Sequence, residues 1–420
     1  MENRLINMPF RTMDILREWR NSKESADRFS TRSPEKTQIN ILLVRSKDII
    51  ICRRISMAQI KIALIGCGNN GLQHLNILKD IEEVKLEAIV DPQIGNFKKE
   101  QFPKCNLYKD YKKMFQNEKV DAVCISTPHK FHYEQVMAAF EHNCHVLLEK
   151  PIALTEKDSR EIVKKAKEKK LVLQVGFECR KSSLYMRIKE IIASGEIGEL
   201  LSISFRHYRG TWMKDWYCKR ELGGNSMGII ETCHYIDLMR FWSGKDVEWV
   251  FASSPKANLR TEYDYPDTSY CQLGFQGGIV ANIEDSHALS CDCFMDTGKS
   301  YGTGEGEWMD PVYGHCFEYS IVGSRGALYV RMLSKQISVL EMKTSYSQRP
   351  QLSLKRVEDY NKVSLHDLVH DHSLLDRLFI NAIQNNTPPA ILPEDALKSH
   401  LVVFAIEKSE ETGEKVYIEG

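Results

Sequence analysis

The chain of 420 residues is 42% hydrophobic and 27% charged, the proportions of an ordinary globular protein large enough for two domain cores. Its 57 basic and 57 acidic side chains balance, which argues against nucleic acid or an anionic membrane as the main partner. No apolar stretch is long enough to span a bilayer, no secretory signal opens the chain, and the 12 cysteines include no CxxC pair. We therefore expect a cytoplasmic protein with unpaired thiols, and no metal site, nucleic-acid partner or membrane partner.

Residues 1–56 are polar and basic and show no pattern that continues into the rest of the chain. Within them, the segment MPFRTMDILREWRNS resembles the opening of sugar N-acetyltransferases, but it is too short to form that fold. We treat residues 1–56 as an extension of uncertain structure, or as sequence that precedes the true start at Met57.

Residues 60–91 carry the most informative pattern. An apolar, β-branched run over residues 60–65 predicts a strand, and the glycine-rich residues 66–71 predict a tight turn. Leucines at helical spacing then predict a helix, and a second apolar strand over residues 86–90 ends at Asp91. A strand, a GxGxxG turn, a helix and a carboxylate about 20 residues later are together typical of a dinucleotide-binding unit.

The residues of that unit have separate expected tasks. Gly66 allows the turn, Gly68 lets the backbone approach a pyrophosphate, and Gly71 lets the helix lie close to the strand. The helix N-terminus favours phosphate, and the Asp91 carboxylate accepts hydrogen bonds from a ribose. Because that carboxylate would repel a 2′-phosphate, NAD is favoured, with NADP as the alternative. The residues assigned to the cofactor here are Gly66, Gly68, Asn69, Asn70, Gly71 and Asp91.

From residue 57 onward strands and helices alternate, which predicts a parallel sheet with crossover helices. The expected strands include residues 120–126, 145–148 and 171–176, and the expected helices include residues 131–143 and 156–169. Ligands of such sheets bind at the carboxyl ends of the strands. We therefore assign to the cofactor residues that follow two of these strands, namely Ser126, Thr127, Pro128, His132, Glu149 and Lys150.

Beyond about residue 180 the pattern changes to short alternating strands separated by glycine turns, which predicts an open, mostly antiparallel sheet. A helix over residues 227–242 places Glu231, His234 and Asp237 at intervals of three, near one face. The other expected strands cover residues 200–208, 249–253, 270–275, 279–284, 318–322 and 327–331, and the other helices cover residues 184–193, 373–385 and 393–412.

Six motifs occur in a fixed order, namely GCGNNGLQHL, STPHKFH, EKP, GGNSMGIIETCHYIDLMRF, IVGSRGAL and PEDALKSHLVVFAIEKSEETGEKV. In this order they resemble the Gfo/Idh/MocA family of NAD(P)-dependent oxidoreductases, over residues 57–418. The resemblance implies an α/β fold with a Rossmann domain over residues 57–180, which holds the doubly wound parallel sheet. An α/β domain over residues 181–420, with the large sheet, would bind the substrate and form the oligomer. It further implies a sugar, sugar-derivative or cyclitol substrate, and a homodimer or homotetramer.

Two residues are candidates for catalysis. Oxidation of a secondary alcohol needs a base for the hydroxyl proton while hydride leaves for the nicotinamide, and a histidine suits that role near neutral pH. The resemblance places this histidine at His234, for which a packed core histidine is the alternative. Lys150 would stabilise the developing alkoxide through its positive charge. The family commonly has an aspartate one helical turn before the histidine, where this chain has Ile230, and the adjacent Glu231 lies about 100° further around the helix.

Substrate candidates follow from the chemistry of sugars. Aromatic rings stack on the apolar face of a sugar, and charged side chains bind its hydroxyl or carboxylate groups. The candidates are Arg180, Tyr208, Trp212, Trp216, Glu231 and His234. A place in the core explains the tryptophans equally well. Two other functions stay open: a redox-neutral NAD enzyme of the glycosidase or epimerase type, and a non-catalytic dinucleotide-binding regulator, the latter motivated by Ile230.

Overall fold

A computed structural model describes residues 41–46, 49–54, 59–96, 105–208, 216–224, 231–255, 258, 261–287, 316–332, 334–343 and 351–419. The chain divides into two compact units, residues 1–55 and residues 56–420. In the first unit, β1 (Ile41–Ser46) and β2 (Ile49–Arg54) form an antiparallel hairpin, which the sequence had not predicted. The second unit contains a six-stranded and a nine-stranded sheet.

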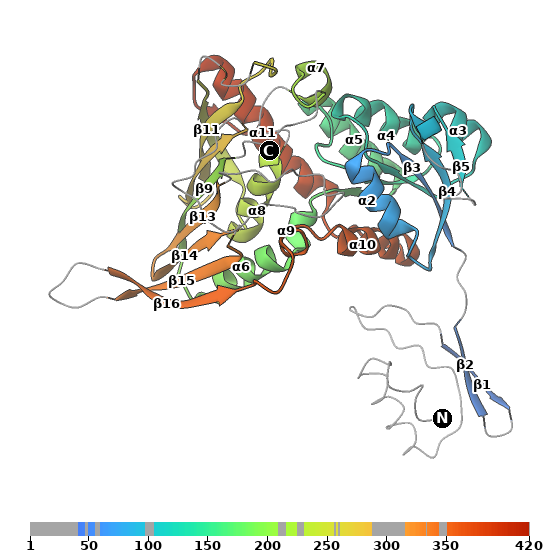
Figure 1. Cartoon of the computed structure of the whole chain (residues 1–420), viewed down its shortest axis with the longest axis horizontal. Helices are drawn as coiled ribbons and strands as arrows, with labels where there is room; N and C mark the ends of the chain where they lie inside the picture. Colours follow the sequence, from blue (N-terminus) through green and yellow to red (C-terminus); the bar gives the residue numbers. More distant parts are fainter. Residues whose placement is uncertain are drawn as a thin grey trace. The chain divides into compact units, whose positions relative to one another are not determined.

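The six-stranded sheet is parallel throughout and has the order β5-β4-β3-β6-β7-β8 (Figure 1). Its strands are β3 (Ile60–Ile65), β4 (Val84–Val90), β5 (Asn106–Tyr108), β6 (Ala122–Ile125), β7 (His145–Leu148) and β8 (Leu173–Val175). The helices that accompany it are α2 (Asn69–Leu78), α3 (Tyr111–Asn117), α4 (His132–Glu141) and α5 (Glu156–Lys169). Because the order reverses at β3, the crevice beyond the carboxyl ends of β3 and β6 is the place where such sheets bind ligands. The predicted doubly wound parallel sheet is therefore confirmed.

Local sequence explains why α5 occupies residues 156–169, as predicted. The Thr155 side chain accepts a hydrogen bond from Asp158 N at 3.1 Å and so caps the N-terminus. Acidic residues occupy the first turn and basic residues the last, which complements the helix dipole. At the C-terminus Lys170 adopts a left-handed conformation, with φ of 56°, and ends the helix.

The nine-stranded sheet has the order β16-β15-β14-β13-β9-β12-β11-β10-β17, and it is antiparallel except where β9 pairs with β12. Its strands are β9 (Leu200–Tyr208), β10 (Val247–Ser253), β11 (Thr268–Phe275), β12 (Val280–Ser286), β13 (Cys316–Gly323), β14 (Gly326–Arg331), β15 (Gln336–Lys343), β16 (Gln351–Asp359) and β17 (Val416–Tyr417). This confirms the predicted open, mostly antiparallel sheet. The sequence analysis did not predict β15, β16 and β17.

Helices cover one face of the nine-stranded sheet (Figure 1). They are α6 (Ser183–Ala193), α8 (Cys233–Ser243) and α11 (Pro393–Thr412). The alternation along β9 fits this arrangement, since Phe205 and His207 are buried toward the helices, whereas Arg206 and Tyr208 belong to the opposite face and are half-buried. The short helical segments of the second unit are η2 (Ile94–Asn96), η4 (His129–Phe131), η5 (Glu178–Lys181), α7 (Arg220–Gly223) and α9 (Leu365–Val369).

The C-terminal helices connect the two sheets. α10 (His372–Asn385) packs against α2, and its Phe379, Ile380 and Ala382 join the apolar core around Leu75 and Leu78. α11 contacts α5, α8 and β10. Both sheets therefore belong to one compact unit, and the division at residue 180 stays a prediction.

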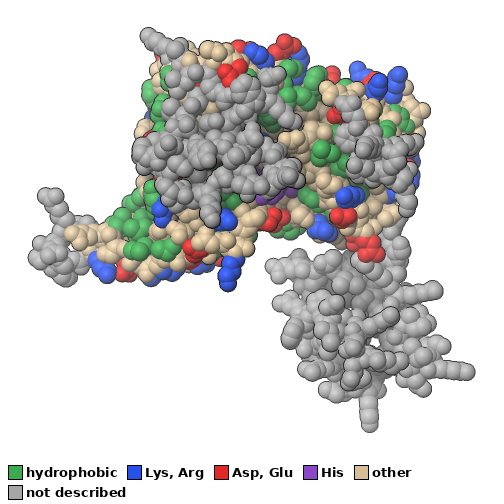
Figure 2. Space-filling view, in the orientation of Figure 1, with side chains coloured by type: hydrophobic (Ala, Val, Ile, Leu, Met, Phe, Trp, Pro, Cys, Tyr) green, Lys and Arg blue, Asp and Glu red, His purple; other side chains and the backbone are tan. Residues whose placement is uncertain are grey.

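On the face that Figure 2 shows, acidic and basic side chains of the described residues are mixed, and neither kind forms a large continuous patch. Hydrophobic side chains gather where β14 to β16 lie, and Leu352, Leu354 and Val357 of β16 are exposed. Within the described part of the chain, no helix combines the length and hydropathy needed to cross a membrane. The cysteines described with their side chains are free and buried, as predicted, and are Cys67, Cys105, Cys124, Cys144, Cys179, Cys218, Cys233, Cys271 and Cys316.

Candidate functional site

The glycine turn after β3 is packed tightly. Gly66 has φ of +94°, and a Cβ placed on it would lie 2.4 Å from the Ser126 carbonyl oxygen. A Cβ on Gly71 would lie 2.0 Å from the Gly66 carbonyl oxygen, so the first turn of α2 touches the glycine turn itself. The tasks predicted for Gly66 and Gly71 are therefore confirmed.

The N-terminus of α2 is open in the way that a phosphate needs. Gly68 is the N-cap, no side chain caps the helix, and a Cβ at Gly68 would meet nothing within 4 Å. Asn69 and Asn70 begin the helix and are exposed and half-buried, respectively. Asp91 holds the turn, because its Oδ2 accepts a hydrogen bond from Cys67 N at 2.9 Å. A pyrophosphate at the helix N-terminus and a ribose near Asp91 fit this cradle.

The loop after β6 reaches the turn after β7 through His132. One ring nitrogen lies 3.0 Å from the Thr127 carbonyl oxygen and the other lies 2.7 Å from the Pro151 carbonyl oxygen. The ring is fully buried, and burial lowers its pKa. Pro128 precedes η4 and, like Ser126, lies at the predicted ligand edge. His132 therefore supports the turn that carries Lys150, and its contact with the cofactor stays a prediction.

Glu149 also has a supporting position. Its Oε1 lies 2.9 Å from His74 Nε2, and His74 Nδ1 lies 2.9 Å from Asp376 Oδ2 on α10. Burial disfavours the charged imidazole, but the Asp376 carboxylate outweighs burial and raises the pKa of His74 well above its ordinary value. Glu149 is buried in this network, which ties α10 to α2 and β7, and its contact with the cofactor stays a prediction.

Lys150 lies at the carboxyl end of β7 and is half-buried. Burial lowers the pKa of its ammonium group, but Cys233, Tyr217, Glu231 and Glu149 together raise that pKa above its ordinary value. Lys150 therefore carries a positive charge at neutral pH, as its predicted role requires.

His234 lies in the first turn of α8 and is buried. Its pKa is lowered to about 4. Burial is the main cause, the Glu178 carboxylate opposes it, and the charge of Lys150 adds to it. Its Nε2 is 3.9 Å from Glu178 Oε1, and the same oxygen lies 2.7 Å from His370 Nδ1. The structure thus brings His234, Lys150 and Glu178 to one side of the sheet edge.

Glu178 and His370 are functional candidates that the sequence analysis missed. Glu178 follows β8 in the stretch GFECR, at the same sheet edge as Lys150, and this position was a usable signal. His370 comes between α9 and α10, almost 200 residues later, so no local pattern connects it with Glu178.

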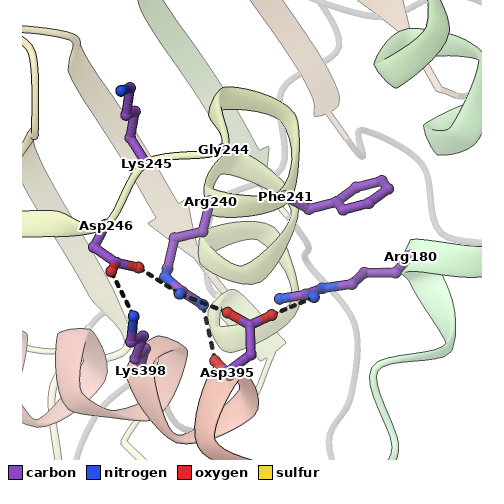
Figure 3. Close-up of a pocket in the computed structure, with 8 residues that line it drawn as sticks. All are labelled: Arg180, Arg240, Phe241, Gly244, Lys245, Asp246, Asp395 and Lys398. Atoms are coloured by element: carbon purple, nitrogen blue, oxygen red, sulfur yellow. Dashed lines mark hydrogen bonds and ion pairs between the residues drawn. The ribbon is translucent and has the colours of Figure 1, made fainter. Parts of the chain in front are cut away.

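Arg180 was predicted to bind substrate, but its guanidinium is held by protein carboxylates. It forms a paired contact with Asp237, in which NH2 lies 2.6 Å from Oδ1, and its NH1 lies 2.5 Å from Asp395 Oδ2. Figure 3 shows Arg180 and Asp395 at a hollow of about 350 Å³ between α8 and α11, where Arg240 also pairs with Asp395. Arg180 therefore has structural partners in Asp237 and Asp395, and its contact with substrate stays a prediction.

The remaining substrate candidates divide by position. Tyr208 lies on the sheet face away from α8, and its hydroxyl donates a hydrogen bond to Glu284 at 2.9 Å, so its contact with substrate stays a prediction. The Trp216 ring stacks on the Tyr217 ring, with 3.7 Å between the ring centroids. It also makes an edge-to-face contact with the His129 ring. Trp212 and Ile230 lie outside the described residues.

Comparison with known proteins decides the family. Residues 60–177 match the oxidoreductase family with an NAD-binding Rossmann fold, and residues 185–329 match the GFO/IDH/MocA C-terminal domain. The two matches together span more than half of the chain. The chain is a member of the Gfo/Idh/MocA family. It is accordingly an NAD-dependent oxidoreductase of that family.

Proteins named as dehydrogenases or reductases are similar to this chain along most of their own length. Myo-inositol 2-dehydrogenase of Thermotoga maritima is 26% identical over 370 residues, which is 86% of this chain and 98% of that protein. 1,5-Anhydro-D-fructose reductase of Ensifer adhaerens is 26% identical over 302 residues, which is 71% of this chain and 80% of that protein. Scyllo-inositol dehydrogenase of Lactobacillus casei, solved with NAD(H) and scyllo-inositol, superposes with a TM-score of 0.65 at 21% identity, covering 86% of this chain and 99% of that one.

Proposed function

We propose that this member of the Gfo/Idh/MocA family transfers hydride between NAD and a carbon that bears a hydroxyl or carbonyl group in a sugar, sugar derivative or cyclitol. The observation that carries the proposal is the meeting of Lys150, His234 and Glu178 at the carboxyl edge of the parallel sheet. The relatives named above support the substrate class, since they are named for inositols and for anhydrofructose.

The cofactor cradle fits NAD. When bound, NAD would supply the nicotinamide carbon that accepts or donates hydride. The open N-terminus of α2 would hold the pyrophosphate, and Asp91 would accept hydrogen bonds from the ribose while it keeps its bond to Cys67 N. The Asp91 carboxylate disfavours a 2′-phosphate, so NAD is proposed over NADP.

His234 is the proposed general base. With a pKa lowered to about 4, its imidazole is neutral at neutral pH and ready to accept the proton of a substrate hydroxyl. Nδ1 is buried and has no hydrogen-bond partner among the described residues, so a group that enters the site meets an unsatisfied nitrogen. The Glu178 carboxylate, 3.9 Å from Nε2, would stabilise the imidazolium that forms.

Lys150 is the proposed oxyanion stabiliser. Its raised pKa keeps the ammonium charged, and a fixed positive charge in a partly water-excluded site favours an alkoxide in the transition state. His234 and Lys150 thus divide the work, since one accepts the proton and the other stabilises the oxygen that loses it. Glu231 and Trp216, together with Trp212, remain the proposed substrate contacts.

We also propose that the protein forms a homo-oligomer through the sheet face that α8 does not cover. Exposed aromatic residues lie there, with Phe251 on β10, Tyr270 on β11 and Tyr329 on β14. Exposed aromatic side chains on one sheet face are enriched at interfaces between proteins. Light scattering after size exclusion tests this, and a monomer at micromolar concentration would contradict it.

The direct test of the activity is the appearance of the reduced-nicotinamide absorbance band. NAD or NADP is offered with a panel of sugars, uronic acids, amino sugars and inositols. We expect reduction of NAD with at least one polyol, and weaker reduction of NADP. NADH binding without any reduction across the panel would overturn the proposal.

A further inference from the structure

Four polar side chains meet on the inner face of the nine-stranded sheet, beside α8. His207 of β9 lies in register with Asp285 of the parallel strand β12. His287, two residues after Asp285, extends from the same face. Glu231 precedes α8 and completes the group, with its Oε2 3.6 Å from His207 Nε2 and 3.8 Å from His287 Nε2. One ligand atom from each of His207, Asp285 and His287 lies within 4.8 Å of the others.

The hydrogen bond between His207 and Asp285 fixes the proton of His207. Nδ1 lies 2.8 Å from Asp285 Oδ1, and because an ionised carboxylate only accepts, Nδ1 carries the proton. In the neutral imidazole, Nδ1 holds the one N–H and Nε2 presents a lone pair, which is the form that binds a metal. This Nε2 is buried and has no hydrogen-bond partner among the described residues. It faces the Glu231 carboxylate at 3.6 Å, so two electron-pair donors point toward each other.

A cation between these donors removes the conflict. Nitrogen and oxygen ligands about 2.0–2.2 Å from one tetrahedral zinc ion lie roughly 3.4 Å apart. The two separations from Glu231 Oε2, 3.6 Å and 3.8 Å, are close to that value and too long for hydrogen bonds. We propose that His207, His287 and Glu231 bind a divalent transition-metal ion of the zinc type, and that Asp285 orients His207 as an outer-sphere carboxylate.

Burial and packing support the site. The side chains of His207 and His287 are fully buried, and that of Asp285 is almost fully buried. Little water therefore screens the attraction between a dication and the carboxylates of Asp285 and Glu231. Phe317 packs against the His207 ring at 4.3 Å, which holds that imidazole in place before a metal arrives.

A second cluster, made of Glu178, Cys179 and His234, is a weaker metal candidate. Its ligand atoms also lie within 4.8 Å of one another. Burial raises the pKa of the Cys179 thiol well above its ordinary value, whereas a metal needs the thiolate. Glu178 Oε1 is already within hydrogen-bond distance of His370 Nδ1. The metal is therefore assigned to the His207 cluster.

Three protein ligands leave a coordination position open. Glu231 precedes the proposed base His234 by three residues, about one helical turn, so the cluster borders the proposed active site. We infer that the open position accepts a hydroxyl oxygen of a polyol whose neighbouring carbon is oxidised. This last step rests on the proposed function, whereas the metal site itself does not.

The first test is metal stoichiometry in the untagged full chain. Protein is stripped with a chelator and titrated with Co²⁺, whose visible absorption reports tetrahedral nitrogen and oxygen ligands. We expect saturation at about one equivalent per chain and displacement of the band by Zn²⁺. Less than about a tenth of an equivalent would overturn the site. The reading does not depend on activity, so a substrate panel that fails leaves it intact.

Variants assign the ligands. His207→Ala and Glu231→Gln should each weaken Co²⁺ binding at least about tenfold, and Asp285→Asn should weaken it about 10-fold to 100-fold. The exposed His142 provides the matched control, and His142→Ala should bind as the wild type does. NADH binding confirms that each variant is folded. Unchanged Co²⁺ binding in His207→Ala and Glu231→Gln, or loss of binding in His234→Ala, would overturn the assignment.

Discussion

Glu178 Oε1 lies 3.9 Å from His234 Nε2, which places a buried negative charge beside the candidate base. Burial opposes the charge on this carboxylate, but His234, His372 and His370 outweigh burial and hold the pKa of Glu178 well below its ordinary value. Glu178 is therefore ionised at neutral pH. It occupies a place beside the histidine in a chain that has Ile230 where the family commonly has an aspartate.

We expect Glu178→Gln to lower kcat about 10-fold to 100-fold, because the imidazolium that forms at His234 loses its counter-charge. NADH affinity should not change. Steady-state kinetics compare kcat of Glu178→Gln with kcat of the matched control Glu168→Gln. The Glu168 side chain is exposed on α5. Equal kcat in the two variants would remove Glu178 from the mechanism.

The lowered pKa of His234 predicts how stability depends on pH. Its pKa is about 4 in the folded protein, and about 6.5 is expected in the unfolded chain. Between these values the unfolded chain binds a proton that the folded protein does not, so stability is full above pH 6.5 and falls as the pH drops toward 4. When the pH is lowered from about 7 to about 5, the free energy of unfolding should fall in both proteins. The fall should be about 2 kcal/mol smaller in His234→Asn than in the wild type. Urea unfolding at both pH values measures this, and equal losses would contradict it.

Gly68 offers a way to separate cofactor binding from folding. A Cβ at Gly68 meets nothing within 4 Å, so Gly68→Ala should fold normally but should raise the Kd for NADH at least about tenfold, because its methyl group enters the pyrophosphate path. Gly95 is also open, and Gly95→Ala is the control with unchanged Kd. Gly66→Ala should instead lose about 1–3 kcal/mol of stability, since φ there is +94° and Ser126 is in the way. Fluorescence titration with NADH decides between these outcomes, and normal affinity in Gly68→Ala would refute the cradle.

The variant Arg180→Ala tests whether Arg180, which lines the hollow in Figure 3, stabilises the folded protein. Arg180→Ala leaves Asp237 buried without its paired cation, and removal of one partner of a buried ion pair costs about 3–5 kcal/mol. Arg187→Ala, at the surface of α6, should cost less than about 1 kcal/mol. Chemical denaturation compares the two. A stable Arg180→Ala protein with a raised KM would support Arg180 as a substrate residue.

Periodicity and terminal residues predicted the elements that have strong local signals. The strand over residues 145–148 and the helices over 156–169 and 393–412 occur where the sequence places them. Pro393 begins the last of these helices and Gly413 follows it, and both are ordinary terminal residues. β16 was missed because polar and apolar side chains do not alternate regularly along it, and its apolar Leu352, Leu354 and Val357 are exposed instead of lining a core.

The candidate site was only partly predictable, because its supporting contacts join distant parts of the chain. His74 and Asp376 are 302 residues apart, and only the fold shows that they bind each other. Strand alternation already predicts that Tyr208 and its neighbour His207 face opposite sides of the sheet, with His207 toward the helices. No ligand spacing revealed the His207 cluster, because its members come from β9, from β12 and the residue after it, and from two residues before α8.

The most direct test of the proposed function is the rate of NAD reduction by His234→Asn and Lys150→Met at saturating polyol. Loss of the base should lower kcat about 100-fold or more, and loss of the ammonium charge should have a similar effect. NADH affinity should stay within a few-fold of wild type, which shows that the cradle is intact. If both variants kept kcat within a few-fold of the wild-type value, the chemistry would not occur at this edge of the sheet.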